Sequence, residues 1–94
     1  MQKVKEIIAK PLSFNQQTDK FNIAIVVSRF NQGVTEALLN SALQRLKELN
    51  FPEQRITILR VPGAIEIGLA AQQIAISDEN CLAIICLGAV IRGE

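Results

Sequence analysis

The stretch IAIVV at residues 23–27 is wholly apolar, and four of its five side chains are branched at Cβ. This length and composition are typical of a strand that is buried on both faces of a sheet. Residues 56–61 and 82–87 form two further apolar runs that are rich in branched side chains. The sequence therefore predicts three strands.

The segment between the first two strands has the pattern of a helix. Residues 31–49 carry apolar side chains at spacings of three and four, which is typical of a helix that packs one face on a sheet. Asn31 is a suitable N-cap, and Pro52 is a stop signal. The expected apolar stripe contains Val34, Leu38, Ala42, Leu46 and Leu49, widened by Leu39 and Leu43.

A second helical stretch begins after Pro62 and Gly63, which break the strand before it. Polar residues 77–80 end this stretch before the third strand. Its apolar side chains are Ile67, Ala70, Ala71 and Ile74.

The predicted order is β-α-β-α-β, so the fold class is α/β. Alternation of strands and helices implies a parallel sheet with flanking helices on both faces and right-handed crossovers. In such sheets ligands bind beyond the carboxyl ends of the strands. Three loops are expected at those ends, at residues 28–33, 62–66 and 88–94.

The composition suits one domain, because the chain has 94 residues and 49% of them are hydrophobic. Residues 1–20 are mixed in character and Pro11 interrupts regular structure there, so we expect an N-terminal arm or edge strand. The α/β domain is then expected at residues 21–94. No apolar run has the length of a signal peptide or a membrane span, and we expect a soluble cytoplasmic protein.

The charge balance argues against polyanionic partners. Ten Lys and Arg against nine Asp and Glu give a net charge of +1, which supplies no broad field for attracting nucleic acid or an anionic membrane. The aromatic residues are four Phe, which argues against a stacking platform for single-stranded nucleic acid. We therefore expect neither nucleic acid nor membrane as a partner.

Cys81 and Cys86 lie five positions apart in one expected strand, or about 16 Å at about 3.3 Å per residue. At that distance they cannot form a disulfide with each other. Two buried thiols that pack as small apolar side chains fit a reducing compartment, and a disulfide to another chain remains open.

Several familiar catalytic and binding motifs are absent from the sequence. The chain contains no histidine, the side chain best suited to proton transfer near neutral pH. Two cysteines do not supply the about four ligands of a zinc site. Neither G-x-G-x-x-G nor G-x-x-x-x-G-K-[ST] occurs, which argues against dinucleotide and P-loop nucleotide binding.

The first loop places Phe30 and Asn31 where a strand ends and a helix begins. An exposed Phe can stack on a flat heterocycle, and an Asn side chain offers both a donor and an acceptor. In the alternative interpretation, Phe30 folds back into the core and Asn31 only caps the helix.

The second and third loops also have two interpretations each. Gly63 and Ala64 allow close approach of a backbone, and Glu66 can accept hydrogen bonds from ligand hydroxyls. Glu66 equally suits the first turn of a helix because it interacts favourably with the helix dipole. In the third loop, which also offers main-chain amides, Arg92 is either an anion contact or a solvated surface charge.

Taken together, SRFN at residues 28–31, VPGAIE at 61–66 and LGAVIRGE at 87–94 resemble the lumazine synthase family. Each motif alone is weak, but all three follow successive strands, and the resemblance covers about residues 22–94. It implies a transferase of riboflavin biosynthesis. The reaction condenses 5-amino-6-ribitylamino-pyrimidinedione with 3,4-dihydroxy-2-butanone 4-phosphate to 6,7-dimethyl-8-ribityllumazine, without metal or organic cofactor. The resemblance also implies a flavodoxin-like sheet and a homo-oligomer, either a pentamer or a larger shell.

The resemblance also assigns substrate-binding roles. Phe30 would stack on the pyrimidine ring and Asn31 would help to fix it. Ala64 and Glu66 would hold the ribityl chain, and Ile65 stands where the family often has an aromatic residue. The main chain at residues 89–91 would meet the pyrimidine edge through Ala89, Val90 and Ile91.

The family's phosphate-binding segment and proton-shuttling histidine would follow Glu94, as would the last strand and helices of the domain. We therefore expect the 94-residue chain to be truncated and to have little or no activity by itself, and we assign no catalytic residue within it. The alternative is a non-catalytic ribityl-pyrimidine-binding or assembly module. A general flavodoxin-like nucleotide or flavin module explains the order of elements but none of the three loops.

Overall fold

The computed structural model describes residues 20–92 and confirms the predicted order of strands and helices. The strand predicted at residues 56–61 has those bounds, and the other two strands are longer than predicted by one residue at one or both ends. The elements are β1 (Asn22–Ser28), α1 (Gln32–Glu48), a short 3-10 helix η1 (Glu53–Arg55), β2 (Ile56–Val61), α2 (Ile65–Ser77) and β3 (Cys81–Leu87).

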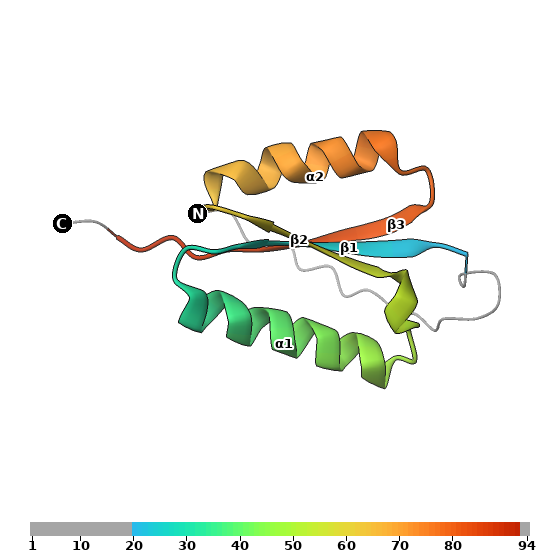
Figure 1. Cartoon of the computed structure of the whole chain (residues 1–94). Helices are drawn as coiled ribbons and strands as arrows, with labels where there is room; N and C mark the ends of the chain where they lie inside the picture. Colours follow the sequence, from blue (N-terminus) through green and yellow to red (C-terminus); the bar gives the residue numbers. More distant parts are fainter. Residues whose placement is uncertain (1–19, 93–94) are drawn as a thin grey trace, which may run out of the picture.

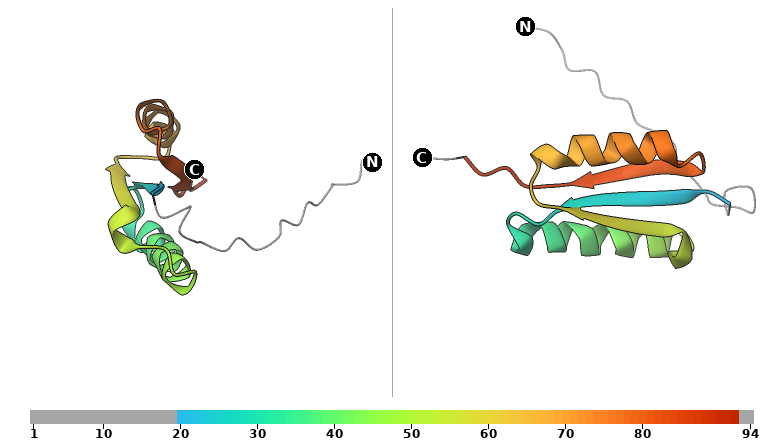
Figure 2. Two further views of the ribbon diagram at one scale, coloured as in Figure 1. Left: turned by 90° about the vertical axis from the view of Figure 1, so that its right-hand side faces the viewer. Right: turned by 45° about the horizontal axis from the view of Figure 1, so that its top comes forward.

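The three strands form one parallel sheet with the order β2-β1-β3. Helix α1 lies on one face of the sheet and α2 on the other (Figure 1). This arrangement follows from right-handed crossovers, because the chain moves from β1 to β2 in one direction and then back across β1 to β3. The two further views show the same layers of helix, sheet and helix (Figure 2).

The core is centred on β1, whose residues from Ile23 to Ser28 are all buried, as predicted for a strand covered on both faces. Side chains alternate between the faces of a strand, so every second residue of β1 faces α1. The buried cluster on that side consists of Ile23, Ile25, Val27, Leu39, Leu46 and Phe51.

The predicted apolar stripe of α1 is partly wrong. Leu39 and Leu46 are buried, whereas Val34 is 46% and Leu38 is 40% exposed. Thr35 lies four residues before Leu39 and is fully buried. The face that packs on the sheet is therefore rotated by about one position, toward a stripe whose first member is the polar Thr35.

The expectation of two buried thiols is also wrong. Both cysteines are free, but Cys81 is half-buried and Cys86 is exposed. The reason is that β3 is an edge strand of the sheet and pairs with β1 alone among the described strands. The predicted N-terminal arm lies outside the described residues, except for Lys20. Neither helix within residues 20–92 has the length and apolar character needed to cross a membrane.

Candidate functional site

The three loops that follow β1, β2 and β3 lie at the same end of the sheet (Figure 1). This end is the carboxyl edge of a parallel sheet, where ligands of such folds bind. The strand order places β1 beside both other strands, so the first loop has the second and the third as its neighbours. The structure therefore brings the predicted site residues to one end of the molecule.

Phe30 does not fold back into the core, because its side chain is 53% exposed. Asn31 occupies the N-cap position of α1, as predicted, but its side chain makes no capping hydrogen bond. Its backbone is left-handed, with φ 58° and ψ 59°. The main-chain carbonyl of Asn31 accepts hydrogen bonds from the N–H groups of Val34 and Thr35 instead. The ring and the amide of this loop therefore remain available to a ligand.

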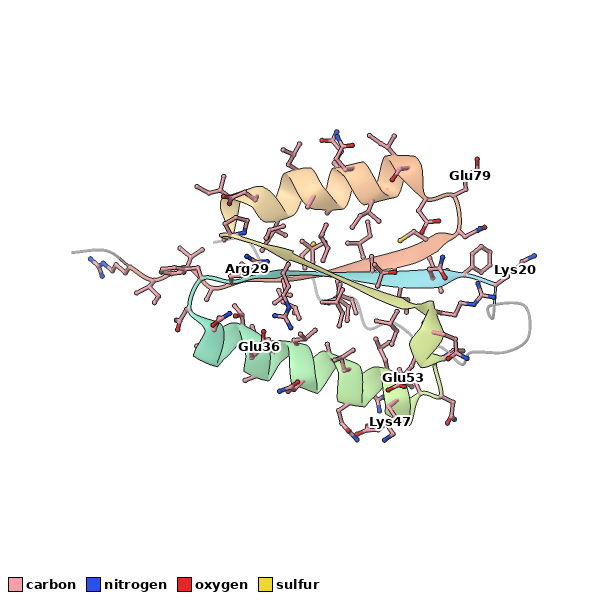
Figure 3. All side chains as sticks on the ribbon, in the orientation of Figure 1. Lys20, Arg29, Glu36, Lys47, Glu53 and Glu79 are labelled. Atoms are coloured by element: carbon pink, nitrogen blue, oxygen red, sulfur yellow. The ribbon has the colours of Figure 1, made fainter. Side chains whose placement is uncertain are left out.

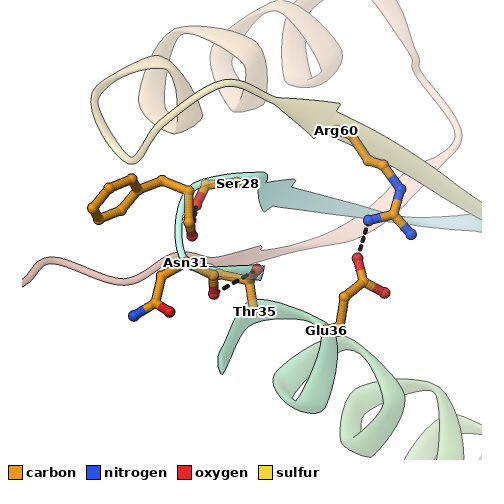
Figure 4. Close-up of polar contacts among 6 residues, drawn as sticks. Ser28, Asn31, Thr35, Glu36 and Arg60 are labelled. Atoms are coloured by element: carbon orange, nitrogen blue, oxygen red, sulfur yellow. Dashed lines mark hydrogen bonds and ion pairs between the residues drawn. The ribbon is translucent and has the colours of Figure 1, made fainter. Parts of the chain in front are cut away.

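A main-chain hydrogen bond joins the first loop to the end of β2. The N–H of Arg29 donates to the carbonyl of Val61 at 2.7 Å. An ion pair between Arg60 of β2 and Glu36 of α1 lies next to this connection (Figure 4). The hydrogen bond joins the start of the first loop to the end of β2, and the ion pair joins the first turns of α1 to the same strand.

The second loop places Glu66 in the first turn of α2, and Ala64 is the N-cap residue. The Glu66 side chain is exposed and has no hydrogen-bond or ion-pair partner within residues 20–92. Its Oε2 atom lies 3.3 Å from the position that a Cβ on Gly63 would occupy, so the carboxylate lies over the loop. Ile65 is 94% exposed. This position suits a favourable interaction with the helix dipole and also leaves the carboxylate able to accept hydrogen bonds from hydroxyl groups.

The third loop passes close to the first turn of α2. A Cβ on Gly88 would lie 2.7 Å from Cδ1 of Ile67 and 3.6 Å from Cβ of Ala64. Beyond this contact, residues 88–92 have no regular structure, and Val90 and Ile91 are exposed while Ala89 is half-buried. Arg92 is exposed as well. The absence of a side chain at residue 88 therefore sets the separation between the second and third loops.

We expect Gly88→Ala to lower the free energy of unfolding by about 1 kcal/mol, because the new methyl group overlaps Cδ1 of Ile67. The backbone itself tolerates alanine, since no described glycine has a positive φ. Ile67→Val removes the overlapping atom and should restore part of the loss in the double variant. Urea unfolding of the four proteins measures this coupling, and strictly additive effects would contradict the contact.

A hollow of about 290 Å³ lies at the other end of α1 and contains none of the predicted site residues. Lys47 and Glu53 mark its position, far from the three loops (Figure 3). Residues 20–92 also contain no group of three or more side chains that could hold a metal ion. The predicted site residues lie in the three loops and not around this hollow.

Sequence reasoning assigned no role to Ser28, which begins the SRFN motif, or to Thr35 in the first turn of α1. They are the buried polar side chains of the described residues, at 1% and 0% exposure. Both contact main-chain carbonyls of the loop. A signal was present in the sequence, since Ser28 directly continues an apolar strand and Thr35 lies one helical turn before Leu39.

Comparison with known proteins gives a consistent family. The model of the family described as 6,7-dimethyl-8-ribityllumazine synthase matches residues 20–94. A protein of that name from Coxiella burnetii (strain Dugway 5J108-111) is 57% identical over 74 residues, which are 79% of this chain and 48% of that protein. A namesake from Paracidovorax citrulli is 48% identical over 75 residues, or 80% of this chain and 48% of that protein. A third protein of this name, from Protochlamydia amoebophila, is 49% identical over 74 residues, which are 79% of this chain and 42% of that protein. The chain spans about half the length of the curated relatives it matches.

Proposed function

The chain belongs to the 6,7-dimethyl-8-ribityllumazine synthase family, and we propose that its three loops form the pyrimidine-binding side of that enzyme's active site. The proposed reaction is the condensation of 5-amino-6-ribitylamino-pyrimidinedione with 3,4-dihydroxy-2-butanone 4-phosphate, a step of riboflavin biosynthesis. A reaction that joins two bound molecules gains much of its acceleration from holding them together, up to about 7–11 kcal/mol. Loops that supply main-chain hydrogen-bonding groups and a complementary surface are suited to holding two molecules together.

The observation that carries this proposal is the connection of the three motif loops at one end of the sheet. The hydrogen bond from Arg29 to Val61 joins the first loop to β2, and the contact of Gly88 with Ile67 joins the third loop to α2. The exposed ring of Phe30 belongs to the first loop and directly follows Arg29 in the sequence. A flat, hydroxylated ligand therefore has a stacking partner, an amide and a carboxylate on connected loops at the same end of the sheet.

We assign each part of the substrate to a loop. Phe30 stacks on the pyrimidine ring, and the Asn31 amide donates to and accepts from its edge. Main-chain groups of Ala89, Val90 and Ile91 meet the pyrimidine edge from the third loop.

The ribityl chain lies along the second loop in this proposal. Ala64 leaves room for close approach, Ile65 supplies an aliphatic contact, and the Glu66 carboxylate accepts hydrogen bonds from ribityl hydroxyls. Residues outside these loops bind the phosphate-bearing substrate and complete the site. Some of them belong to a neighbouring subunit of a homo-oligomer, which is either a pentamer or a larger shell. We place the enzyme in the cytoplasm.

We expect Glu66→Ala to weaken binding of a ribitylamino-pyrimidine analogue by about tenfold, because hydrogen bonds to a charged group contribute about 1.5–3 kcal/mol when desolvated and less at an exposed site. Binding of the same pyrimidine without its ribityl chain should not change. Isothermal titration of the full chain with both compounds measures the difference.

Glu79→Ala is the matched control, because Glu79 is an exposed carboxylate in the turn after α2, away from the three loops (Figure 3). This variant should bind both compounds like the unaltered chain. If Glu66→Ala weakened both compounds equally, the assignment of the ribityl chain to the second loop would be wrong. If the unaltered chain bound neither compound, the proposed function would fail.

The second candidate is a non-catalytic ribityl-pyrimidine-binding or assembly module, which the lack of histidine in these 94 residues favours. Lumazine formation distinguishes the two candidates when it is measured for this chain beside the Coxiella burnetii relative. We expect the 94-residue chain to bind the pyrimidine analogue with little or no turnover. Turnover close to that of the relative would assign full catalysis to the residues present here.

A further inference from the structure

Both buried polar side chains of residues 20–92 contact the first loop. Ser28 ends β1 and Thr35 lies near the start of α1. The Ser28 hydroxyl donates to the carbonyl of Phe30 at 3.5 Å, and the Thr35 hydroxyl donates to the carbonyl of Asn31 at 3.3 Å (Figure 4). We refer to Ser28 and Thr35 as the hydroxyl pair. The pair contacts two consecutive carbonyls of one loop.

The conformation of Asn31 differs from that of an ordinary N-cap residue. N-cap residues usually have an extended backbone and a side-chain oxygen that accepts a helix N–H. Asn31 is left-handed, and its carbonyl accepts the N–H groups of Val34 and Thr35 at 3.0 and 3.1 Å. Asn tolerates this region better than most residues, but the surrounding structure must still hold it there. The Thr35 hydroxyl is a third donor to the same carbonyl.

We propose that the hydroxyl pair positions Phe30 and Asn31 for the pyrimidine, an inference that rests on the proposed function. The pair holds the main chain of the loop from the buried side. The ring of Phe30 stays exposed, and the side chain of Asn31 extends away from Thr35 (Figure 4). Ser28 and Thr35 are therefore positioning residues, because they act on the ligand through the two residues beside them.

The hydroxyl pair contributes more to the order of the loop than to stability. Both distances exceed the about 2.5–3.0 Å of an ordinary hydroxyl hydrogen bond. Removing the Thr35 hydroxyl leaves the Asn31 carbonyl with two N–H donors, so the change leaves that carbonyl paired. A loop that is already ordered loses less conformational freedom when a ligand binds. The expected effect of losing the pair is therefore weaker binding with nearly unchanged folding.

The test uses Thr35→Val, which keeps the shape of the side chain, and Ser28→Ala. In the full chain, we expect each variant to bind a ribitylamino-pyrimidine analogue about three- to tenfold more weakly. The NMR order parameters of the amides at residues 30 and 31 should fall in the absence of ligand, while the thermal midpoint stays within about 4 °C. Thr35→Ser keeps the hydroxyl and should restore both affinity and order.

Thr57→Val and Ser41→Ala are the matched controls, because both remove an exposed hydroxyl elsewhere, on β2 and on α1. Neither should change affinity. Unchanged affinity and order parameters in Thr35→Val and Ser28→Ala would overturn the proposal, as would failure of Thr35→Ser to restore them. Absence of binding by the unaltered chain would instead overturn the proposed function, and the order parameters would still decide whether the hydroxyl pair holds the loop.

Discussion

Leu39→Ala is expected to lower the free energy of unfolding by about 2–5 kcal/mol. Leu39 is 2% exposed and packs in the cluster formed by α1 and alternate residues of β1. Truncation removes apolar contacts and leaves a cavity that the neighbouring side chains fill only in part. Small domains have little stability to lose, so this change is a large fraction of the total. Urea unfolding followed by circular dichroism measures the difference.

Leu38→Ala is the matched control, because it makes the same chemical change one position earlier on the same helix. Leu38 is 40% exposed, so we expect a loss of about 1 kcal/mol or less. The experiment should be repeated at several protein concentrations, because a stability that depends on concentration reveals association. Equal losses in the two variants at low concentration would contradict the packing of α1 described above.

The strands and the order of elements could be predicted from the sequence because apolar runs are a strong local signal. The run at residues 23–27 became the central strand, and the residues around Pro62 and Gly63 end β2 as expected. Which face of α1 packs on the sheet could not be predicted equally well. Apolar spacing gave several overlapping stripes, and packing selected the one that contains the polar Thr35. The predicted burial of Cys86 is wrong for a different reason, since the exposure of a strand's side chains depends on whether the strand lies at the edge of its sheet.

The site shows the same division between local and tertiary information. Three motifs after three strands were sufficient to predict that Phe30, Ala64 and Ala89 would lie at one end of the sheet, because parallel strands place their carboxyl ends together. Residue type alone did not predict the left-handed backbone of Asn31, although Asn adopts this conformation more readily than most residues. Its carbonyl accepts local hydrogen bonds from the first turn of α1, and the Thr35 side chain that donates one of them is fully buried, which is a tertiary feature of the packed helix.

Phe30→Ala is expected to weaken binding of the ribitylamino-pyrimidine analogue by roughly five- to hundredfold. Stacking of an aromatic side chain on a base-like ring contributes about 1–3 kcal/mol, and each 1.4 kcal/mol is about tenfold in the dissociation constant. Because Phe30 is 53% exposed, its removal should change the free energy of unfolding by less than about 1 kcal/mol. Isothermal titration gives the affinity, and urea unfolding shows that the loss does not come from unfolding.

Phe21→Ala also removes a phenyl ring, but just before the opposite end of β1. There the Lys20 ammonium lies 5.8 Å from the centre of the Phe21 ring. This control should keep the affinity of the unaltered chain, because Phe21 is at the amino end of the strand and away from the three loops. Phe30→Leu separates the two contributions of the ring, since leucine keeps apolar contact but cannot stack. Full affinity in Phe30→Leu would assign the contact to apolar burial alone, whereas full affinity in Phe30→Ala would remove Phe30 from the pyrimidine site.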